Sequence, residues 1–228
     1  MEKHNVFDEI EIEKASDLVA MRYNRLNKNQ VVGESQAMIS LVGELFIDPD
    51  RFDASLFEEI SMKTVLEYLS NGHKLYRDKK LPELQWNVAQ LIESLGYSHP
   101  LSIYLTQFVK RYHESLIAHM DEEDNYVFPY INQLLKNQTK TSVLRPATFL
   151  NGWSNLATFL LAHTDTEADL NMVGQLLKSY STQANLAPQI NRILTQLSLL
   201  ELDLHIHAKI EDEVLIPKAL QLEKTICS

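Results

Sequence analysis

Apolar residues recur at intervals of three and four residues along almost the whole chain, and few residues interrupt them. This spacing places apolar side chains on one face of a helix. Only six glycines and seven prolines occur among the 228 residues, and no segment shows the alternating pattern that is typical of a strand. The sequence therefore predicts an all-α fold built from long amphipathic helices.

The residues that break helices divide the chain into segments. We expect breaks at Gly33 and near residues 48–50, 96–100, 137–146 and 187–188. Four long helices are predicted between them, at about 61–95, 100–136, 146–181 and 188–223, and Pro82 should kink or divide the first. Long helices with short connections indicate an up-down-up-down four-helix bundle over residues 59–228. Residues 1–58 should form a small helical N-terminal extension, with helices near 8–29 and 34–46.

Charge and cysteine content disfavour several classes of function. The formal net charge of -10 repels phosphate backbones and anionic lipid surfaces, so we expect neither nucleic acid nor membrane as a partner. Cys227 is the only cysteine, which excludes an internal disulfide and a thiolate metal cage. Any metal must then be held by nitrogen and oxygen. The first residues are acidic and lack the apolar run of a signal peptide, so a cytoplasmic location is predicted.

Two eleven-residue segments match each other at fixed offsets. Residues 119–129 read HMDEEDNYVFP, and residues 207–217 read HAKIEDEVLIP. In both, a histidine is followed by glutamate after four residues and by proline after ten; the pairs are His119 with Glu123 and His207 with Glu211. Because four residues turn a helix through about 400°, each histidine and its glutamate lie on one face and can reach one point in space.

The faces that carry these pairs are also apolar. Leu116 lies beside His119, and Leu204 and Val214 lie beside His207 at helical spacing, so both pairs should point into the core. A buried glutamate without a partner would cost several kcal/mol or would become protonated, and two of them would repel each other. We therefore expect a cation between the two glutamates. Imidazole and carboxylate ligands suit iron, manganese or zinc, and helical bundles can hold two irons in this way.

The other two core helices each supply a histidine in a corresponding place. His163 shares an apolar stripe with Leu156 and Leu160, and His73 shares one with Leu66 and Leu69. Each of the four predicted core helices thus contributes one inward histidine.

These motifs resemble the hemerythrin-like domains, and most closely the repair-of-iron-centres proteins, over residues 60–222. The resemblance rests on the two H-x-x-x-E segments that end apolar-apolar-proline, together with single histidines in the first and third helices. It implies a di-iron bundle linked to nitric oxide and oxidative stress. Its pattern implies His73, His119, His163 and His207 as terminal iron ligands, with Glu123 and Glu211 as bridges.

With this ligand set, each iron would receive two imidazoles and two carboxylate oxygens. An oxo or hydroxo bridge would bring each of the two irons to about five ligands, which leaves a position for a small molecule such as nitric oxide or dioxygen. The chain departs from the family in lacking the adjacent cysteine pair of its small N-terminal domain. Glu167 also stands where oxygen-carrying hemerythrins have a second histidine, four residues after the histidine of the third helix.

Acidic residues near the predicted ligands have two possible roles. Glu122 and Glu167 could orient histidine N–H groups, and solvated helix faces explain them equally well. We expect the acidic run from Asp121 to Asp124 to have an exposed side, with only Glu123 turned inward.

The ligand set favours a stress protein that binds or reduces nitric oxide, or that supplies iron for rebuilding damaged iron–sulfur clusters. Its partners would then be a diatomic ligand and damaged iron–sulfur proteins. The alternative is a module that senses dioxygen or redox state without turnover, and a bundle that has lost its metal is a third possibility. The sequence does not decide whether the chain is an enzyme.

Overall fold

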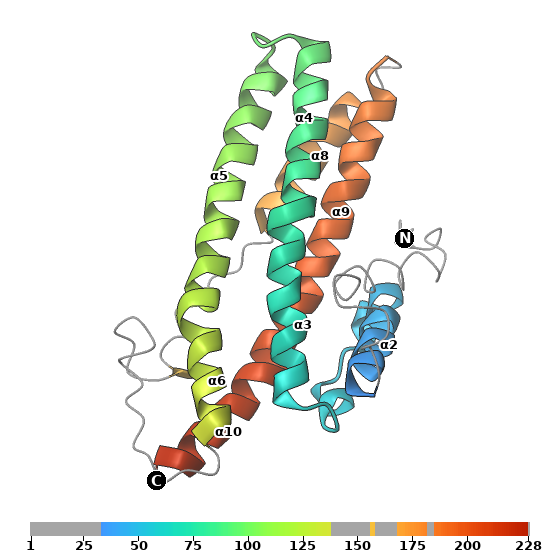
Figure 1. The fold of residues 1–228 in the computed structure, drawn as a ribbon. Coiled ribbons are helices and arrows are strands. Elements are labelled where there is room, and N and C mark those ends of the chain that lie inside the picture. Colours follow the sequence, from blue (N-terminus) through green and yellow to red (C-terminus); the bar gives the residue numbers. More distant parts are fainter. Residues whose placement is uncertain (1–32, 138–155, 158–167, 182–184, 228) are drawn as a thin grey trace. The chain divides into compact units, whose positions relative to one another are not determined.

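The structure, a computed structural model, describes residues 33–137, 156–157, 168–181 and 185–227. Within these ranges the chain is almost entirely helical and contains no strand, which confirms the predicted all-α fold (Figure 1). None of the helices described is long and apolar enough to cross a membrane. The chain divides into two compact units, termed here the bundle unit (73–125 and 162–205) and the terminal unit (1–72, 126–161 and 206–228).

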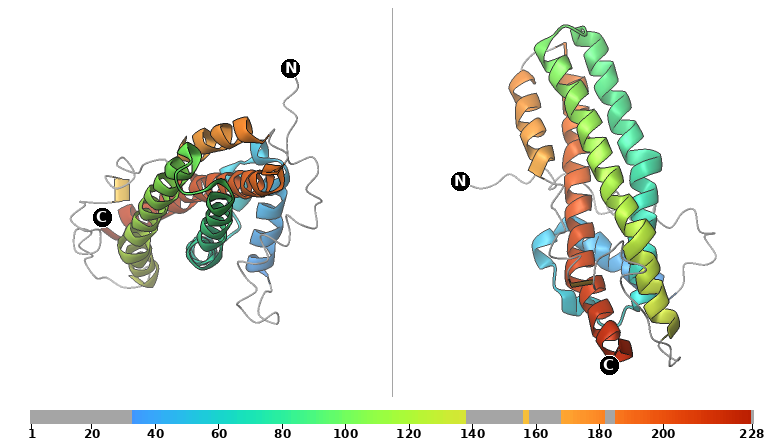
Figure 2. Two further views of the ribbon diagram at one scale, coloured as in Figure 1. Left: turned by 90° about the horizontal axis from the view of Figure 1, so that it is seen from above. Right: turned by 90° about the vertical axis from the view of Figure 1, so that its left-hand side faces the viewer.

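In the described part of the bundle unit, four helices alternate in direction. They are α4 (Leu81–Leu95), α5 (Pro100–Glu122), α8 (Ala168–Tyr180) and the greater part of α9 (Ala187–Ile210). The rings of His99 and Tyr180 lie 5.9 Å apart, and Gln189 Nε2 donates to Ser94 Oγ at 3.0 Å. The turn from α4 to α5 and the connection from α8 to α9 therefore lie at the same end of the unit, in the predicted up-down-up-down order (Figures 1 and 2).

Apolar side chains from all four helices form the core of the bundle unit. Leu91, Leu105, Val173 and Ile193 come from α4, α5, α8 and α9 in turn, and each is at most 1% exposed. Burial of such side chains contributes about 1.5–3 kcal/mol each. Gly96 ends α4 with a φ of 86°, a conformation that glycine adopts without strain, and so turns the chain into α5.

The terminal unit joins helices from distant parts of the sequence. It contains α2 (Glu34–Ile47), short 3₁₀ turns at Pro49–Arg51 and Ala54–Phe57, most of α3 (Met62–Leu75), α6 (Phe128–Asn137) and α10 (Ile216–Cys227).

Polar contacts hold the elements of the terminal unit together. The Glu34 carboxylate accepts from the Ser61 N–H and from Thr64 Oγ1, which ties α2 to the start of α3. Lys218 Nζ on α10 donates to the carbonyls of Phe57 and Ile60. The helices α2 and α10 thus belong to one compact unit. The division that the sequence predicts, into an extension (1–58) and a bundle (59–228), stays a prediction.

Each of the three long helices that the structure describes over most of its length contains a five-residue π turn. The turns are Tyr76–Lys80, Glu123–Val127 and Glu211–Leu215. Each ends two residues before a proline, at Pro82, Pro129 and Pro217. Proline has no N–H to donate to the carbonyl four residues earlier, so the hydrogen-bond spacing widens where that bond is missing. The sequence predicts that Pro82 kinks or divides the first helix; the chain instead stays helical from Met62 to Leu95, and the α-helical hydrogen bonding is interrupted by the π turn that precedes the proline.

The predicted helices agree with the structure where it describes them. The second runs from Pro100 through the π turn to the end of α6 at Asn137, and the fourth runs from Ala187 to Cys227. The first part of the third helix lies outside the described residues, apart from residues 156–157, which are helical. The predicted helix near 8–29 also lies outside them.

Candidate metal centre

His119 and Glu123 stand one turn apart where α5 passes into its π turn. His119 Nε2 lies 2.9 Å from Glu123 Oε1, as the four-residue spacing predicts. The Glu123 side chain is 0% exposed and that of His119 is 20% exposed. The prediction that Glu123 points into the core is confirmed.

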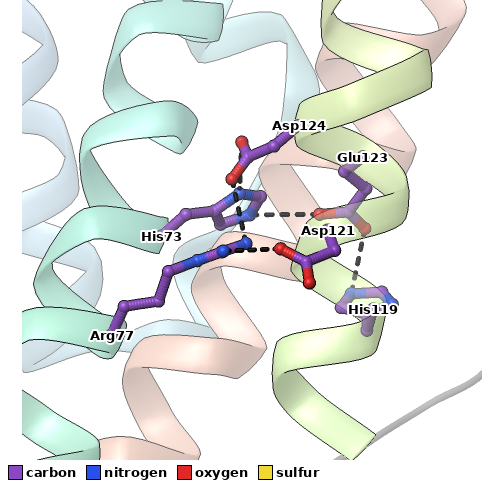
Figure 3. Close-up of polar contacts among 6 residues, drawn as sticks. All are labelled: His73, Arg77, His119, Asp121, Glu123 and Asp124. Atoms are coloured by element: carbon purple, nitrogen blue, oxygen red, sulfur yellow. Dashed lines mark hydrogen bonds and ion pairs between the residues drawn. The ribbon is translucent and has the colours of Figure 1, made fainter.

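His73, near the end of α3, reaches the other oxygen of the same carboxylate. Its Nε2 lies 3.0 Å from Glu123 Oε2, and its side chain is 2% exposed. The two oxygens of Glu123 thus face two different imidazoles, one from α3 and one from α5 (Figure 3). A carboxylate placed between two nitrogen ligands can bind an ion through each oxygen.

A second set of polar contacts lies on the far side of the His73 ring. His73 Nδ1 is 2.9 Å from Asp124 Oδ1, and the other oxygen of Asp124 accepts from Arg77 Nη2 at 3.0 Å. Arg77 Nη1 donates to Asp121 Oδ1 at 2.6 Å. Figure 3 shows the guanidinium of Arg77 between the two aspartates.

These contacts determine the charge of His73 in the metal-free protein. Burial opposes the charged ring, but the hydrogen bonds to Asp124 and Glu123 and the charges of those carboxylates outweigh burial and raise the pKa of His73. A protonated imidazole donates from both nitrogens, which suits a ring placed between two carboxylates. A metal ion at Nε2 would replace the proton shared with Glu123.

His207 and Glu211 belong to the terminal unit, at the end of α9 and the start of its π turn. His207 is 5% exposed and Glu211 is 1% exposed. Both glutamates of the duplicated segments are therefore buried, and both begin a π turn. His163 lies outside the described residues, as does Glu167.

The donor chemistry of these residues fits a metal ion. His73 Nε2 and Glu123 Oε2, both buried and 3.0 Å apart, are close enough to contact one shared ion. Nitrogen and oxygen donors without thiolate suit iron, manganese or zinc. A positive ion would also compensate the buried carboxylate charge, which is costly without a partner.

The contacts of Asp124, Asp121 and Arg77 are not predicted by the sequence. The sequence predicts an exposed side for the acidic run, with only Glu123 turned inward, whereas Asp124 and Asp121 are partly exposed and still contact His73 and Arg77. One signal was present, because an aspartate follows the glutamate in both duplicated segments, at Asp124 and Asp212. The sequence offered Glu122 and Glu167 as groups that could orient a histidine N–H, with solvated helix faces as the equal alternative; the carboxylate that contacts His73 Nδ1 is that of Asp124.

Comparison with known proteins gives relatives of one kind. The chain is 21% identical over 159 residues to the iron-sulfur cluster repair protein ScdA of two strains of Staphylococcus epidermidis, an alignment that covers 70% of this chain and 67% of each relative. It is 21% identical over 197 residues to ScdA of Staphylococcus haemolyticus, covering 86% of this chain and 82% of the relative. No family model and no solved structure matches. These similarities confirm the resemblance to iron-centre repair proteins that the H-x-x-x-E segments indicated.

Proposed function

We propose that this chain is a non-haem di-iron protein that serves in the repair of damaged iron–sulfur clusters. The observation that carries this proposal is the arrangement of Glu123, whose two oxygens face His73 and His119 separately inside the protein. If an ion replaces the proton in each of these contacts, one carboxylate joins two ions. The relatives named as iron–sulfur cluster repair proteins favour iron among the metals that these donors suit.

The full proposed ligand set adds the second duplicated segment and the third helix. Glu211 would be the second bridging carboxylate, because it occupies the same place as Glu123 in its segment and is equally buried. His207 would join His73 and His119 as a terminal ligand. His163, outside the described residues, enters on its sequence position alone.

The residues of the chain would bind, orient and shield the metal pair. His73 and Glu123 are almost completely buried, so they would hold the irons in a site from which bulk water is largely excluded. His119 is partly exposed and marks the side on which a small molecule could approach. Two irons bound there would supply redox chemistry and open coordination positions for nitric oxide or dioxygen. Within this proposal, the protein either reduces nitric oxide or releases iron for rebuilding clusters, in the cytoplasm as the sequence predicts.

The test is a metal count on freshly purified protein, followed by a repair assay. We expect about two irons per chain, an optical spectrum of an oxo- or hydroxo-bridged pair, and recovery of activity when the protein is added to a dehydratase whose cluster has been damaged by nitric oxide. Glu123→Gln should lose iron and repair activity, whereas Glu122→Gln, a neighbour of the same charge, should keep both.

Other outcomes have distinct meanings. A wild-type protein without iron, or one that holds iron and neither reacts with nitric oxide nor restores the dehydratase, overturns the proposal. Reversible dioxygen binding with no consumption of nitric oxide would instead identify a sensing module.

A further inference from the structure

We infer that Asp124 is a positioning residue for the metal centre, that it fixes His73 as a ligand through Nε2, and that Arg77 and Asp121 hold Asp124 in place. This inference rests on the proposed metal centre and assigns a role to three side chains outside the ligand set. The observation behind it is the chain of contacts from His73 to Asp124, Arg77 and Asp121 (Figure 3).

The first step concerns the two nitrogens of His73. A neutral imidazole carries one proton, and a metal binds only the nitrogen without it. An ionised carboxylate can accept a hydrogen bond but cannot donate one, so Asp124 Oδ1 at 2.9 Å keeps the proton on Nδ1. The lone pair of Nε2 then faces Glu123, the side on which the proposed ions would lie.

The second step concerns the position of Asp124 itself. Its side chain is 33% exposed, so water competes for its oxygens. Its two oxygens are engaged separately, Oδ1 by His73 and Oδ2 by Arg77, and the second arm of the Arg77 guanidinium binds Asp121. A guanidinium held by two carboxylates has a fixed plane, which restricts rotation of Asp124.

Sequence spacing explains why these four side chains meet. Arg77 follows His73 by four residues, and Asp124 follows Asp121 by three, so each pair lies on one face of its helix. The two faces are joined by three contacts of 2.6–3.0 Å, all within the bundle unit. Groups that orient metal-bound histidines in this way typically change metal affinity by about 10- to 100-fold when they are removed.

A merely structural role is the competing explanation, because the same contacts tie α3 and the π turn that follows it to α5 and the π turn that follows it. The matched control is Asp121→Asn, which removes one carboxylate contact to Arg77, as Asp124→Asn does, but leaves His73 untouched. Ferrous iron affinity is measured anaerobically by competition with a chelator, with circular dichroism confirming that each variant folds.

We expect Asp124→Ala to weaken iron binding by about 10- to 100-fold. Asp124→Asn should have a smaller effect, since its amide oxygen can still accept from Nδ1. Asp121 acts on His73 only through Arg77, which keeps its bond to Asp124 when Asp121 is replaced, so Asp121→Asn should change affinity by less than about threefold. A zinc-loaded, ¹⁵N-labelled protein provides a second readout: long-range ¹H–¹⁵N spectra should show the His73 proton on Nδ1 in the wild type and a changed pattern in Asp124→Ala.

Three results would overturn the inference: a loss of affinity in Asp121→Asn as large as that in Asp124→Ala, unchanged affinity in Asp124→Ala, or a wild-type His73 proton on Nε2. Failure of the proposed function is recognised separately. Iron binding with neither a reaction with nitric oxide nor repair activity removes that function and leaves the affinity data to judge Asp124, whereas a wild-type protein that binds no metal overturns both.

Discussion

Replacing Glu123 by glutamine should destabilise the metal-free protein by about 3 kcal/mol at pH 6. Glu123 is 0% exposed and contacts two imidazole nitrogens at 3.0 and 2.9 Å. Removing one partner of a buried ion pair costs about 3–5 kcal/mol, since the other charge stays buried without compensation. We expect the lower end of that range, because His119 is 20% exposed and partly solvated, and because glutamine keeps one oxygen acceptor.

The size of this effect should depend on pH in a defined direction. The pKa of His73 is raised in the folded protein above the ordinary value of 6.5. The stability that its charged form contributes is therefore fully present below pH 6.5 and is lost as the pH rises through the raised pKa. The difference between wild type and Glu123→Gln should be largest at pH 6 and should narrow in more alkaline buffer.

Urea unfolding of chelator-treated protein, followed by far-ultraviolet circular dichroism, measures this difference. Glu122→Gln provides the control: it removes the same charge from the neighbouring, half-buried position and should change the free energy of unfolding by less than about 0.5 kcal/mol. A Glu123→Gln protein as stable as wild type at pH 6, or a difference that grows with pH, would refute the argument that the two histidines and this carboxylate stabilise each other without metal.

Three further substitutions test the packing around the site. Tyr130→Phe removes the hydroxyl that donates to buried Glu223 and should lower the free energy of unfolding in urea by about 1.5–3 kcal/mol; no loss would contradict that bond. Leu105→Ala should lower the free energy of unfolding by about 2–5 kcal/mol, whereas Ile103→Ala, which truncates a side chain that is 50% exposed, should lower it far less. Similar losses in the two variants would argue against the assigned core. The Glu34 carboxylate accepts hydrogen bonds that lower its pKa below the ordinary value of 4.5. The ionised carboxylate therefore stabilises the folded protein above pH 4.5, and this stability is lost as the pH falls through the lowered pKa. Glu34→Gln should therefore lower the thermal midpoint at pH 7 but not in strong acid, and a midpoint that is unchanged at pH 7 would count against this contribution.

Local sequence signals predicted the helices and several of the breaks between them. The glycine at Gly96 and the proline at Pro100 place the turn between α4 and α5 where the structure has it. The spacing of His119 and Glu123 was enough to place both on one face, because that relation depends only on helix geometry. Burial of Glu211 followed from the apolar residues on its own helix face.

Contacts between distant segments could not be predicted in the same way. Asp124 looked like part of a solvated acidic run, since its partner His73 lies 51 residues away and its other partner, Arg77, lies on the same distant helix. Nor did periodicity reveal the π turns, because an apolar stripe on each side of the extra residue still fits an ordinary helix. The equal distance from histidine to proline in the two duplicated segments, which end at Pro129 and Pro217, was visible in the sequence, but only the backbone shows that a π turn precedes each of these prolines.

The link between the π turns and the prolines limits how these segments can be moved into other proteins. An extra residue within one turn rotates everything after it by about 100° relative to a straight helix. A design that copies only the histidine and the glutamate onto a regular α-helix would therefore not reproduce the direction in which side chains point after Glu123 and Glu211. The transplantable unit runs from each histidine through to Pro129 or Pro217, and the recipient must accept a helix whose two halves differ in phase.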